Sequence, residues 1–329
     1  MPFLEIIWLG TPLWMWLAFL AVVIVLLALD LGVLHRTQRE IGVRESLLLS
    51  GFYISMGLAF GGWVWWQMGE AASVAYVTGF VIEKSLAMDN VFVIAMIFTY
   101  FAVPRVYQHR VLFWGILGVI VLRAVMIGMG ATLVEKFSWT LYVFAAFLIF
   151  TGVKMWLTAD KAYNAGASPA LVWIRRRFPI TDELHGDRFW VRRKDPVSGR
   201  QAWFMTPLFL ALAMVEIVDV VFAVDSVPAI FAITTDPFIV YTSNIFAILG
   251  LRALYFALAA MVDRFHYLKY ALSILLVFIG SKIFVADALG LAKIPPAISL
   301  CITFAILAAG IGWSLWKTRD VKRSLLTER

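Results

Sequence analysis

The sequence is poor in charge, cysteine and histidine. Of its 329 residues, 15% are charged and 62% are hydrophobic, whereas an average soluble domain has roughly 25% charged residues. The low fraction of charged residues and the high fraction of hydrophobic residues together exclude an ordinary soluble globular protein. The single cysteine, Cys301, excludes a disulfide or a thiolate metal site within one chain. The four histidines fall in predicted loops or at the ends of apolar runs, which argues against a buried site for Zn²⁺ or Cu⁺.

Long apolar runs dominate the chain instead. A transmembrane helix needs about 20 mainly apolar residues. Nine runs are candidates: 13–34, 47–67, 72–101, 111–133, 139–158, 206–233, 238–262, 267–288 and 295–316. They are continuous rather than alternating, so a β-barrel is not expected. The first run is too long for a cleavable signal and is expected to remain as a span. The sequence therefore predicts an all-α polytopic membrane protein with about nine transmembrane helices.

The charges of the connecting segments alternate along the chain. Every odd-numbered loop and the C-terminal tail are basic, and the even-numbered loops are not. The positive-inside rule then predicts a multi-pass protein with its N-terminus outside and its C-terminus in the cytoplasm. The net charge of +7 follows from this topology, so no nucleic-acid partner is expected.

The fifth loop carries its own pattern. The stretch "VWIRRRFP" at 172–179 has the composition of a basic amphipathic segment that rests on the inner leaflet. Regulation or the binding of a partner is the alternative interpretation of this loop.

The sequence also contains an internal repeat. "YVFAAFLIFTGVK" at 142–154 matches "YALSILLVFIGSK" at 270–282, and Arg123 stands opposite Arg252. The chain then divides into 1–71 (spans 1 and 2), 72–158 (repeat one, spans 3–5), 159–205 (a basic cytoplasmic loop), 206–288 (repeat two, spans 6–8) and 289–329 (span 9 and the tail). Each copy has three spans, an odd number, so the copies must insert in opposite orientations. Inverted repeats of this kind are typical of secondary transporters.

Ionisable and polar residues concentrate in the first span of each copy: Glu83, Lys84, Asp89 and Asn90 in one, and Glu216, Asp219, Asp225 and Ser226 in the other, with Asp30 near the inner end of span 1. A carboxylate at the middle of a membrane costs about 2.5–3.5 kcal/mol, so this cost must be offset. Glu83 and Asn90 share a helix face, as do Asp219 and Ser226, because each pair is seven residues apart. Pro228 removes a backbone hydrogen bond, so a discontinuous span 6 is expected.

Two interpretations can offset the cost of these carboxylates. Carboxylate, amide, hydroxyl and carbonyl oxygens together suit Mg²⁺, Ca²⁺ or Mn²⁺, and protons can replace the metal when it leaves. The alternative is internal pairing, in which three bases are available to three of the acids: Lys84, Arg123 and Arg252 to Asp89, Asp225 and Glu216. The acids outnumber these bases by six to three, so pairing alone leaves carboxylates that need another partner. Asn244 fits a metal ligand and an interhelical hydrogen-bond partner equally well.

The same residues lie in longer motifs: "ALDLGVLHR" in span 1, "IEKSLAMDNVFV" in span 3 and "VEIVDVVFAVDSVPAIFAITTDPFIVYTSNIFAILGLRALYF" in spans 6 and 7. These motifs resemble the TerC/Alx family of bacterial membrane proteins. The resemblance implies a transporter of the bacterial cytoplasmic (inner) membrane that belongs to the wider LysE-like superfamily. Family members are associated with Mn²⁺ export, alkali response and tellurite resistance. It would assign metal binding to Asp89, Asn90, Glu216, Asp219 and Asp225.

The sequence thus leads to the hypothesis of Mn²⁺ efflux in exchange for protons. Asp30 and Glu83 are the candidates for proton coupling or gating, and Lys84, Arg123 and Arg252 are the expected structural ion-pair partners. The expected partners are the divalent ion, protons and membrane lipid, and an oligomer is possible. No permanently bound cofactor and no enzymatic activity are expected.

Two alternatives to transport stay open at this point. The first is an intramembrane aspartyl hydrolase in which Asp89 and Asp225 share a proton. The second is a non-transporting membrane protein of tellurite or alkali stress.

Overall fold

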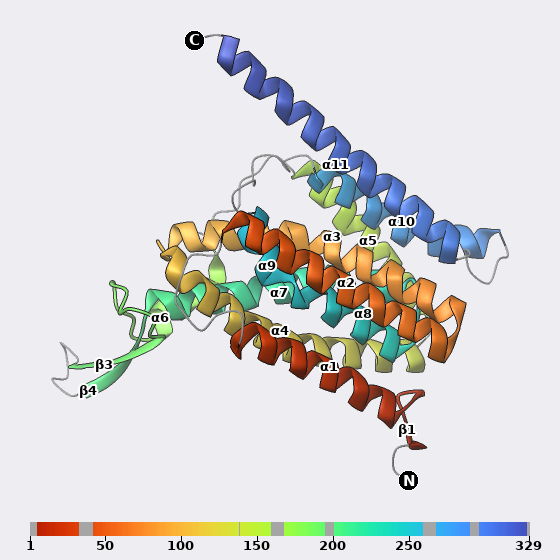
Figure 1. Ribbon diagram of the computed structural model, residues 1–329, viewed down its shortest axis with the longest axis horizontal. Helices are drawn as coiled ribbons and strands as arrows, with labels where there is room; N and C mark the ends of the chain where they lie inside the picture. Colours follow the sequence, from red (N-terminus) through yellow and green to blue (C-terminus); the bar gives the residue numbers. More distant parts are fainter. Residues whose placement is uncertain are drawn as a thin grey trace.

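The computed structural model describes residues 5–32, 42–137, 139–158, 168–194, 201–258, 268–289 and 296–327. Its helices are α1 (Leu13–Gly32), α2 (Val43–Met68), α3 (Glu70–Tyr100), α4 (Arg105–Lys136), α5 (Thr140–Leu157), α6 (Pro169–Arg177), α7 (Pro207–Phe231), α8 (Pro237–Leu249), α9 (Leu251–Leu258), α10 (Leu268–Ala288) and α11 (Pro296–Thr327). Two hairpins pair β1 (Ile7–Trp8) with β2 (Thr11–Pro12), and β3 (Trp190–Lys194) with β4 (Gln201–Met205). The hairpins lie at opposite ends of the helical bundle (Figure 1).

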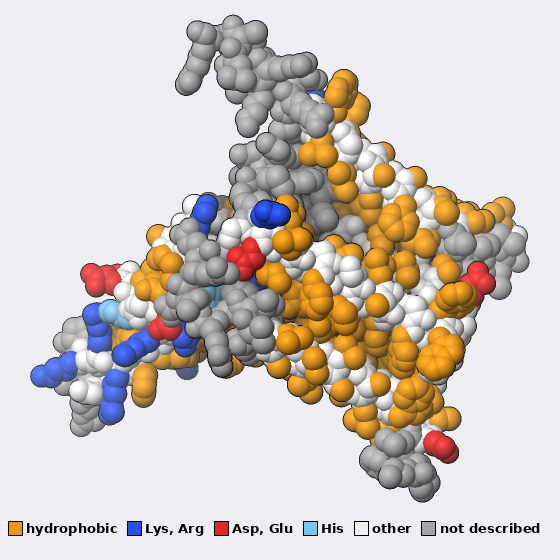
Figure 2. Space-filling model, viewed as in Figure 1, with side chains coloured by type: hydrophobic (Ala, Val, Ile, Leu, Met, Phe, Trp, Pro, Cys, Tyr) orange, Lys and Arg blue, Asp and Glu red, His pale blue; other side chains and the backbone are white. Residues whose placement is uncertain are grey.

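The bundle has the surface of a membrane protein. Seven helical segments in the described part of the chain are long and apolar enough to cross a membrane: α2, α4, α5, α7, the α8–α9 pair taken together, α10 and α11. In the described part of the chain, the predicted spans correspond to these helices together with α1 and α3. Apolar side chains cover much of the face of the bundle seen in Figure 2, and Lys and Arg side chains gather at the end that carries α6 and the β3–β4 hairpin. The predicted class, an all-α polytopic membrane protein, is confirmed.

The internal repeat of the sequence is also present in the packing of α5 against α10. A Cβ atom built on Gly152, late in α5, would lie 2.8 Å from the carbonyl oxygen of Ser273, early in α10. A Cβ atom on Gly280, late in α10, would lie 2.5 Å from the carbonyl oxygen of Ala145, early in α5. The repeat pairs Gly152 with Gly280 and Ala145 with Ser273, so the two contacts are equivalent. The equivalent helices are antiparallel, as inverted repeats require.

The other spans of the two copies also make equivalent packing contacts. The repeat makes α3 equivalent to α7, and α4 equivalent to the α8–α9 span. Accordingly α3 packs on α8, α7 packs on α4, and α3 packs directly on α7. The first span of each copy therefore lies at the centre of the bundle, and these two spans carry the ionisable residues.

α7 is one helix, so the predicted discontinuity of span 6 is wrong. The helix continues through Pro228 to Phe231. The hydrogen bond that the proline removes lies in the last turns of the helix, where Val227 and Ile230 are buried in a cluster with Ile127 of α4. This apolar packing holds the end of the helix despite the lost bond.

Span 7 is instead divided at Gly250, between α8 and α9. A Cβ atom on Gly250 would lie 2.9 Å from Tyr53 Cβ, so the glycine allows α2 to approach this point closely. At the other end of α8, the Asp236 carboxylate accepts hydrogen bonds from the backbone of Phe238 at 2.8 Å and of Ile239 at 3.3 Å. Burial raises the pKa of Asp236, and these two hydrogen bonds oppose the rise.

The close crossing of α5 and α10 yields a stability prediction. Gly152→Ala should lower the free energy of unfolding by about 1–3 kcal/mol, because the added methyl group meets the α10 backbone. The matched control is Gly128→Ala in α4, where a Cβ atom has nothing within 4 Å. The control should be neutral or stabilising, since alanine is the better helix former. Thermal unfolding of the detergent-solubilised chain measures both, and equal effects would contradict the crossing.

Candidate cation site

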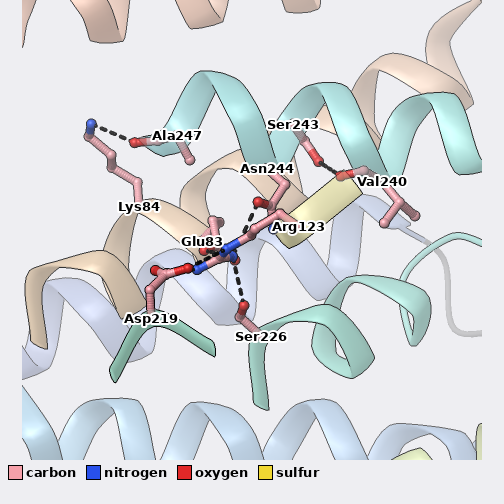
Figure 3. Close-up of polar contacts among 9 residues, drawn as sticks. All are labelled: Glu83, Lys84, Arg123, Asp219, Ser226, Val240, Ser243, Asn244 and Ala247. Carbon is pink, nitrogen blue, oxygen red and sulfur yellow. Dashed lines mark hydrogen bonds and ion pairs between the residues drawn. The ribbon is translucent and has the colours of Figure 1, made fainter. Parts of the chain in front are cut away.

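Arg123 of α4 is the centre of a buried polar network (Figure 3). Its side chain is 1% exposed. Nε and Nη2 donate to the two carboxylate oxygens of Asp219 at 3.2 and 3.1 Å, and Nη1 forms an ion pair with Glu83. Nη1 also donates to Ser226 Oγ at 2.9 Å and to Asn244 Oδ1 at 3.1 Å. One guanidinium therefore joins α4 to α3, α7 and α8.

The two carboxylates of this network occupy equivalent places in the repeat. Glu83 precedes Asp89 by six residues, and Asp219 precedes Asp225 by six. Glu83 and Asp219 are 1% and 6% exposed, and both bond to Arg123 with charge-assisted geometry. One guanidinium cannot neutralise two carboxylates. The network keeps a net negative charge when both acids are ionised.

Several buried oxygens near this network have no hydrogen-bond partner among the described residues. They are Glu83 Oε2, Asn90 Oδ1 and Glu216 Oε2. A buried carboxylate or amide oxygen without a donor is costly. Each of these atoms is a hard oxygen that a divalent cation accepts as a ligand, so the arrangement has the chemistry of a cation site.

A small cavity of about 20 Å³ lies beside the network. Asn90, Asp219 and Arg252 are its polar lining residues, and apolar residues of α3, α4 and α7 line much of the rest. This volume is enough for one water molecule or one ion. Asn90, whose Oδ1 has no described hydrogen-bond partner, and Asp219, which Arg123 binds, therefore both border the small cavity.

Glu216 lies one helical turn before Asp219, on the same face of α7. Its carboxylate packs directly on Gly118 of α4, where any added Cβ would collide with it. Gly115, nearly one turn before Gly118, lines the small cavity. The two glycines therefore leave room on α4 for the Glu216 carboxylate, and this is the reason that a bulkier residue would not fit there.

A second, larger cavity of about 230 Å³ borders the network on another side. Glu83, Asn90 and Arg123 line it, together with Lys154 and apolar residues of α3, α5 and α10. Lys154 is exposed, whereas Glu83, Asn90 and Arg123 are buried. Asn90 thus borders both cavities, with Glu83 facing the larger one and Asp219 facing the smaller one.

Lys84 forms no ion pair with the described side chains; its ammonium donates to the carbonyl oxygen of Ala247 at 2.9 Å (Figure 3). In an unbroken helix this carbonyl would accept from the residue four positions later, but α8 ends at Leu249. A Cβ on Gly250 would lie 2.8 Å from Lys84 Nζ. The lysine therefore satisfies a carbonyl at the division of span 7, and the adjacent glycine gives it access.

The other residues singled out in the sequence are placed as follows. Arg252 is 4% exposed and lines the small cavity. The backbones of Asp89 and Asp225 belong to α3 and α7, and that of Asp30 to α1, but their side chains lie outside the described part of the structure. Among the side chains that are described, no three of the His, Cys, Asp and Glu type are grouped closely enough to hold a metal.

Sequence reasoning missed the identity of the arginine's partners. It paired the bases with Asp89, Asp225 and Glu216, whereas Arg123 binds Glu83 and Asp219. The seven-residue spacing from Asp219 to Ser226 was the available signal, because it places both on the face that meets Arg123. No local signal in the sequence points to the contact of Lys84 with span 7.

The shared guanidinium yields a second stability prediction. Arg123→Gln should lower the free energy of unfolding by about 3–5 kcal/mol, because it leaves two buried carboxylates without their counter-ion. Adding Glu83→Gln and Asp219→Asn to this variant should recover most of the loss. Thermal unfolding of the solubilised chain reports both effects, and wild-type stability of Arg123→Gln alone would show that the network contributes nothing.

Comparison with known proteins agrees with this architecture. The profile of the "Integral membrane protein TerC family" matches residues 68–322. A membrane protein of Myxococcus xanthus, STKORF319, is 46% identical over 315 residues, covering 96% of each chain. A protein of Escherichia coli strain K12, named "Putative membrane-bound redox modulator Alx", is 44% identical over 316 residues, covering 93% of this chain and 95% of that one.

The names of these relatives do not indicate an enzyme, and no solved structure matches the chain. The family profile covers more than half of the sequence, and the relatives align over nearly all of it. The chain is therefore a member of the TerC family of integral membrane proteins.

Proposed function

We propose that this protein exports a divalent metal cation, Mn²⁺, across the bacterial inner membrane in exchange for protons. The observation that carries the proposal is the set of unpaired buried oxygens where the two inverted copies meet. The alternation of loop charge supports an orientation with the N-terminus outside and the C-terminus in the cytoplasm. In this proposal the protein is a transporter and not an enzyme, and the metal is its cargo.

The ligand chemistry favours a hard cation. Asn90 and Glu216 offer oxygens that no described donor satisfies, and Asp219 lines the small cavity beside Asn90. Asp89 and Asp225 belong to the same two helices, and we assign them to the same ion on the strength of the sequence. An all-oxygen set of this kind suits Mn²⁺, Mg²⁺ or Ca²⁺.

Proton exchange follows from the same residues. When the metal leaves, the carboxylates that held it must be neutralised again, and protons can do this. Glu83 keeps one oxygen without a hydrogen-bond partner and faces the larger cavity. We assign to Glu83 a role in proton coupling, and to Asp30 a role in gating that rests on its position in α1.

Two other functions receive less support. A thiol–disulfide role within one chain would need two cysteines, and this chain has only Cys301, so the redox wording of some relatives' names does not carry over through its thiol. An aspartyl hydrolase would need Asp89 and Asp225 to share a proton. Both functions should survive chelation of divalent metals, whereas transport of the metal should not.

A flux measurement tests the metal assignment. In liposomes that contain the purified protein, Glu216→Gln should lower Mn²⁺ flux by about 10- to 100-fold, as loss of a metal-site group commonly does. Asn90→Ala and Asp225→Ala should act in the same direction. The control is Glu70→Gln, an exposed acid at the start of α3, which should leave flux unchanged. Normal flux in all three site variants would disprove the assignment.

A separate measurement tests proton coupling. In the same liposomes, a pH-sensitive dye should report proton movement opposite to Mn²⁺ movement. Glu83→Gln should reduce the protons moved per Mn²⁺, because it removes the titrating group. Glu135→Gln, an exposed acid in the last turn of α4, should not. Mn²⁺ transport by the unaltered protein without any proton signal would rule out exchange.

A further inference from the structure

A basic surface stands at the end of the bundle that carries α6 and the β3–β4 hairpin (Figure 2). We call it the basic platform and define it as Arg175, Arg176 and Arg177 of α6 with Arg192, Arg193 and Lys194 of β3. All six side chains are exposed. None of them takes part in the cation site.

The basic platform is fixed to the bundle. On α6, Leu171 and Ile174 are 1% and 8% exposed, because they pack in a cluster with Leu208 of α7. The backbone of Thr181 donates to the carbonyl of Met205 at 2.9 Å, which joins the segment after α6 to β4. The arginines of α6 therefore extend from a helix whose other face is buried against the bundle.

The hairpin is fixed at the point where α7 begins. The Thr206 hydroxyl donates to the carbonyl of Arg188 at 2.7 Å and accepts from the backbone of Phe209 at 3.4 Å. The Trp190 ring of β3 lies 4.5 Å from the Phe209 ring of α7. The first turn of α7 and the base of the hairpin are thus one unit.

These attachments fix the position of the basic platform along the membrane normal. Leu208, against which α6 packs, is the second residue of α7, and the same cluster contains Phe101 and Val103 just after α3. α6 therefore lies where two spans leave the apolar belt. This is the level of the lipid headgroups.

Exposed tryptophans accompany the basic residues. Trp173 of α6 is 62% exposed, and Trp203 of β4 is 60% exposed. In the hairpin, Trp203 is paired directly with Arg192, so the two side chains share one face of the sheet. Tryptophan beside arginine at the end of a span is the composition found at a membrane interface.

We propose that the basic platform binds the anionic headgroups of phospholipids in the adjacent leaflet. Clustered bases beside a span attract anionic lipid headgroups through their charge, which lysine carries as well as arginine. Of the three acids between α6 and β3, Asp187 is paired with Arg110, whereas Asp182 and Glu183 are exposed, so the six bases of the platform exceed the two remaining acids. A soluble anion would use the charges but not the exposed tryptophans, so the composition favours lipid.

The test uses the full chain in detergent, titrated with phosphatidylglycerol or with phosphatidylcholine. Phosphatidylglycerol should raise the unfolding temperature and remain bound in native mass spectra, and phosphatidylcholine should do neither. Arg175→Gln with Arg176→Gln and Arg177→Gln should lose most of this shift and of the bound lipid. The same three positions changed to Lys keep the charge and should retain binding, which separates lost charge from misfolding.

Three outcomes would overturn the proposal. The Gln variant could retain as much phosphatidylglycerol as the unaltered chain. Glycerol phosphate or a short RNA could stabilise the protein as strongly as the lipid, which would assign the surface to a soluble anion. The Lys variant could lose binding together with the Gln variant while both stay folded. Mn²⁺ flux of the Gln variant in phosphatidylcholine liposomes should be normal, so this proposal and the transport proposal can fail independently.

Discussion

The contact of the Arg123 guanidinium with two carboxylates is the constraint on which the centre of the bundle depends. Glu83 and Asp219 come from different copies of the repeat and are almost completely buried. Burying either carboxylate in an apolar bundle without a counter-ion would be costly. Through Ser226 and Asn244 the same guanidinium also fixes the positions of α7 and α8. A single side chain thereby sets the spacing of four helices around the two cavities.

The repeat is symmetric in its helices but not in its charges. Glu83 and Asp219 are equivalent positions, and both are bound by the arginine of one copy. The equivalent arginine, Arg252, follows the division of span 7 and lines the small cavity. Lys84 satisfies a backbone carbonyl at that division. An antiparallel pair of similar halves thus produces a centre whose two sides differ, and cavities of unequal size follow from it.

Local sequence patterns predicted the membrane-spanning helices correctly, but they did not predict the polar contacts between these helices. The run 139–158 became α5 (Thr140–Leu157), and 206–233 became α7 (Pro207–Phe231), because apolar length decides a span. The repeat at 142–154 and 270–282 correctly implied an antiparallel pair. The division of span 7 at Gly250 was missed, because it depends on the approach of Lys84 and Tyr53 from other helices. Contacts between distant spans leave no mark in local spacing.

The count of deep charges bears on what the site can carry. Within the first two spans of the two repeats, the sequence has five carboxylates: Glu83, Asp89, Glu216, Asp219 and Asp225. It has three bases: Lys84, Arg123 and Arg252. If all are ionised, two negative charges remain. One divalent cation cancels two charges, and so do two protons, so both loaded forms would be neutral in an apolar membrane. A form with neither would keep two uncompensated charges and be costly. For the metal–proton exchange proposed above, this balance favours one dication for two protons over passive flow of the metal, because an empty site would have to be refilled before the bundle could rearrange.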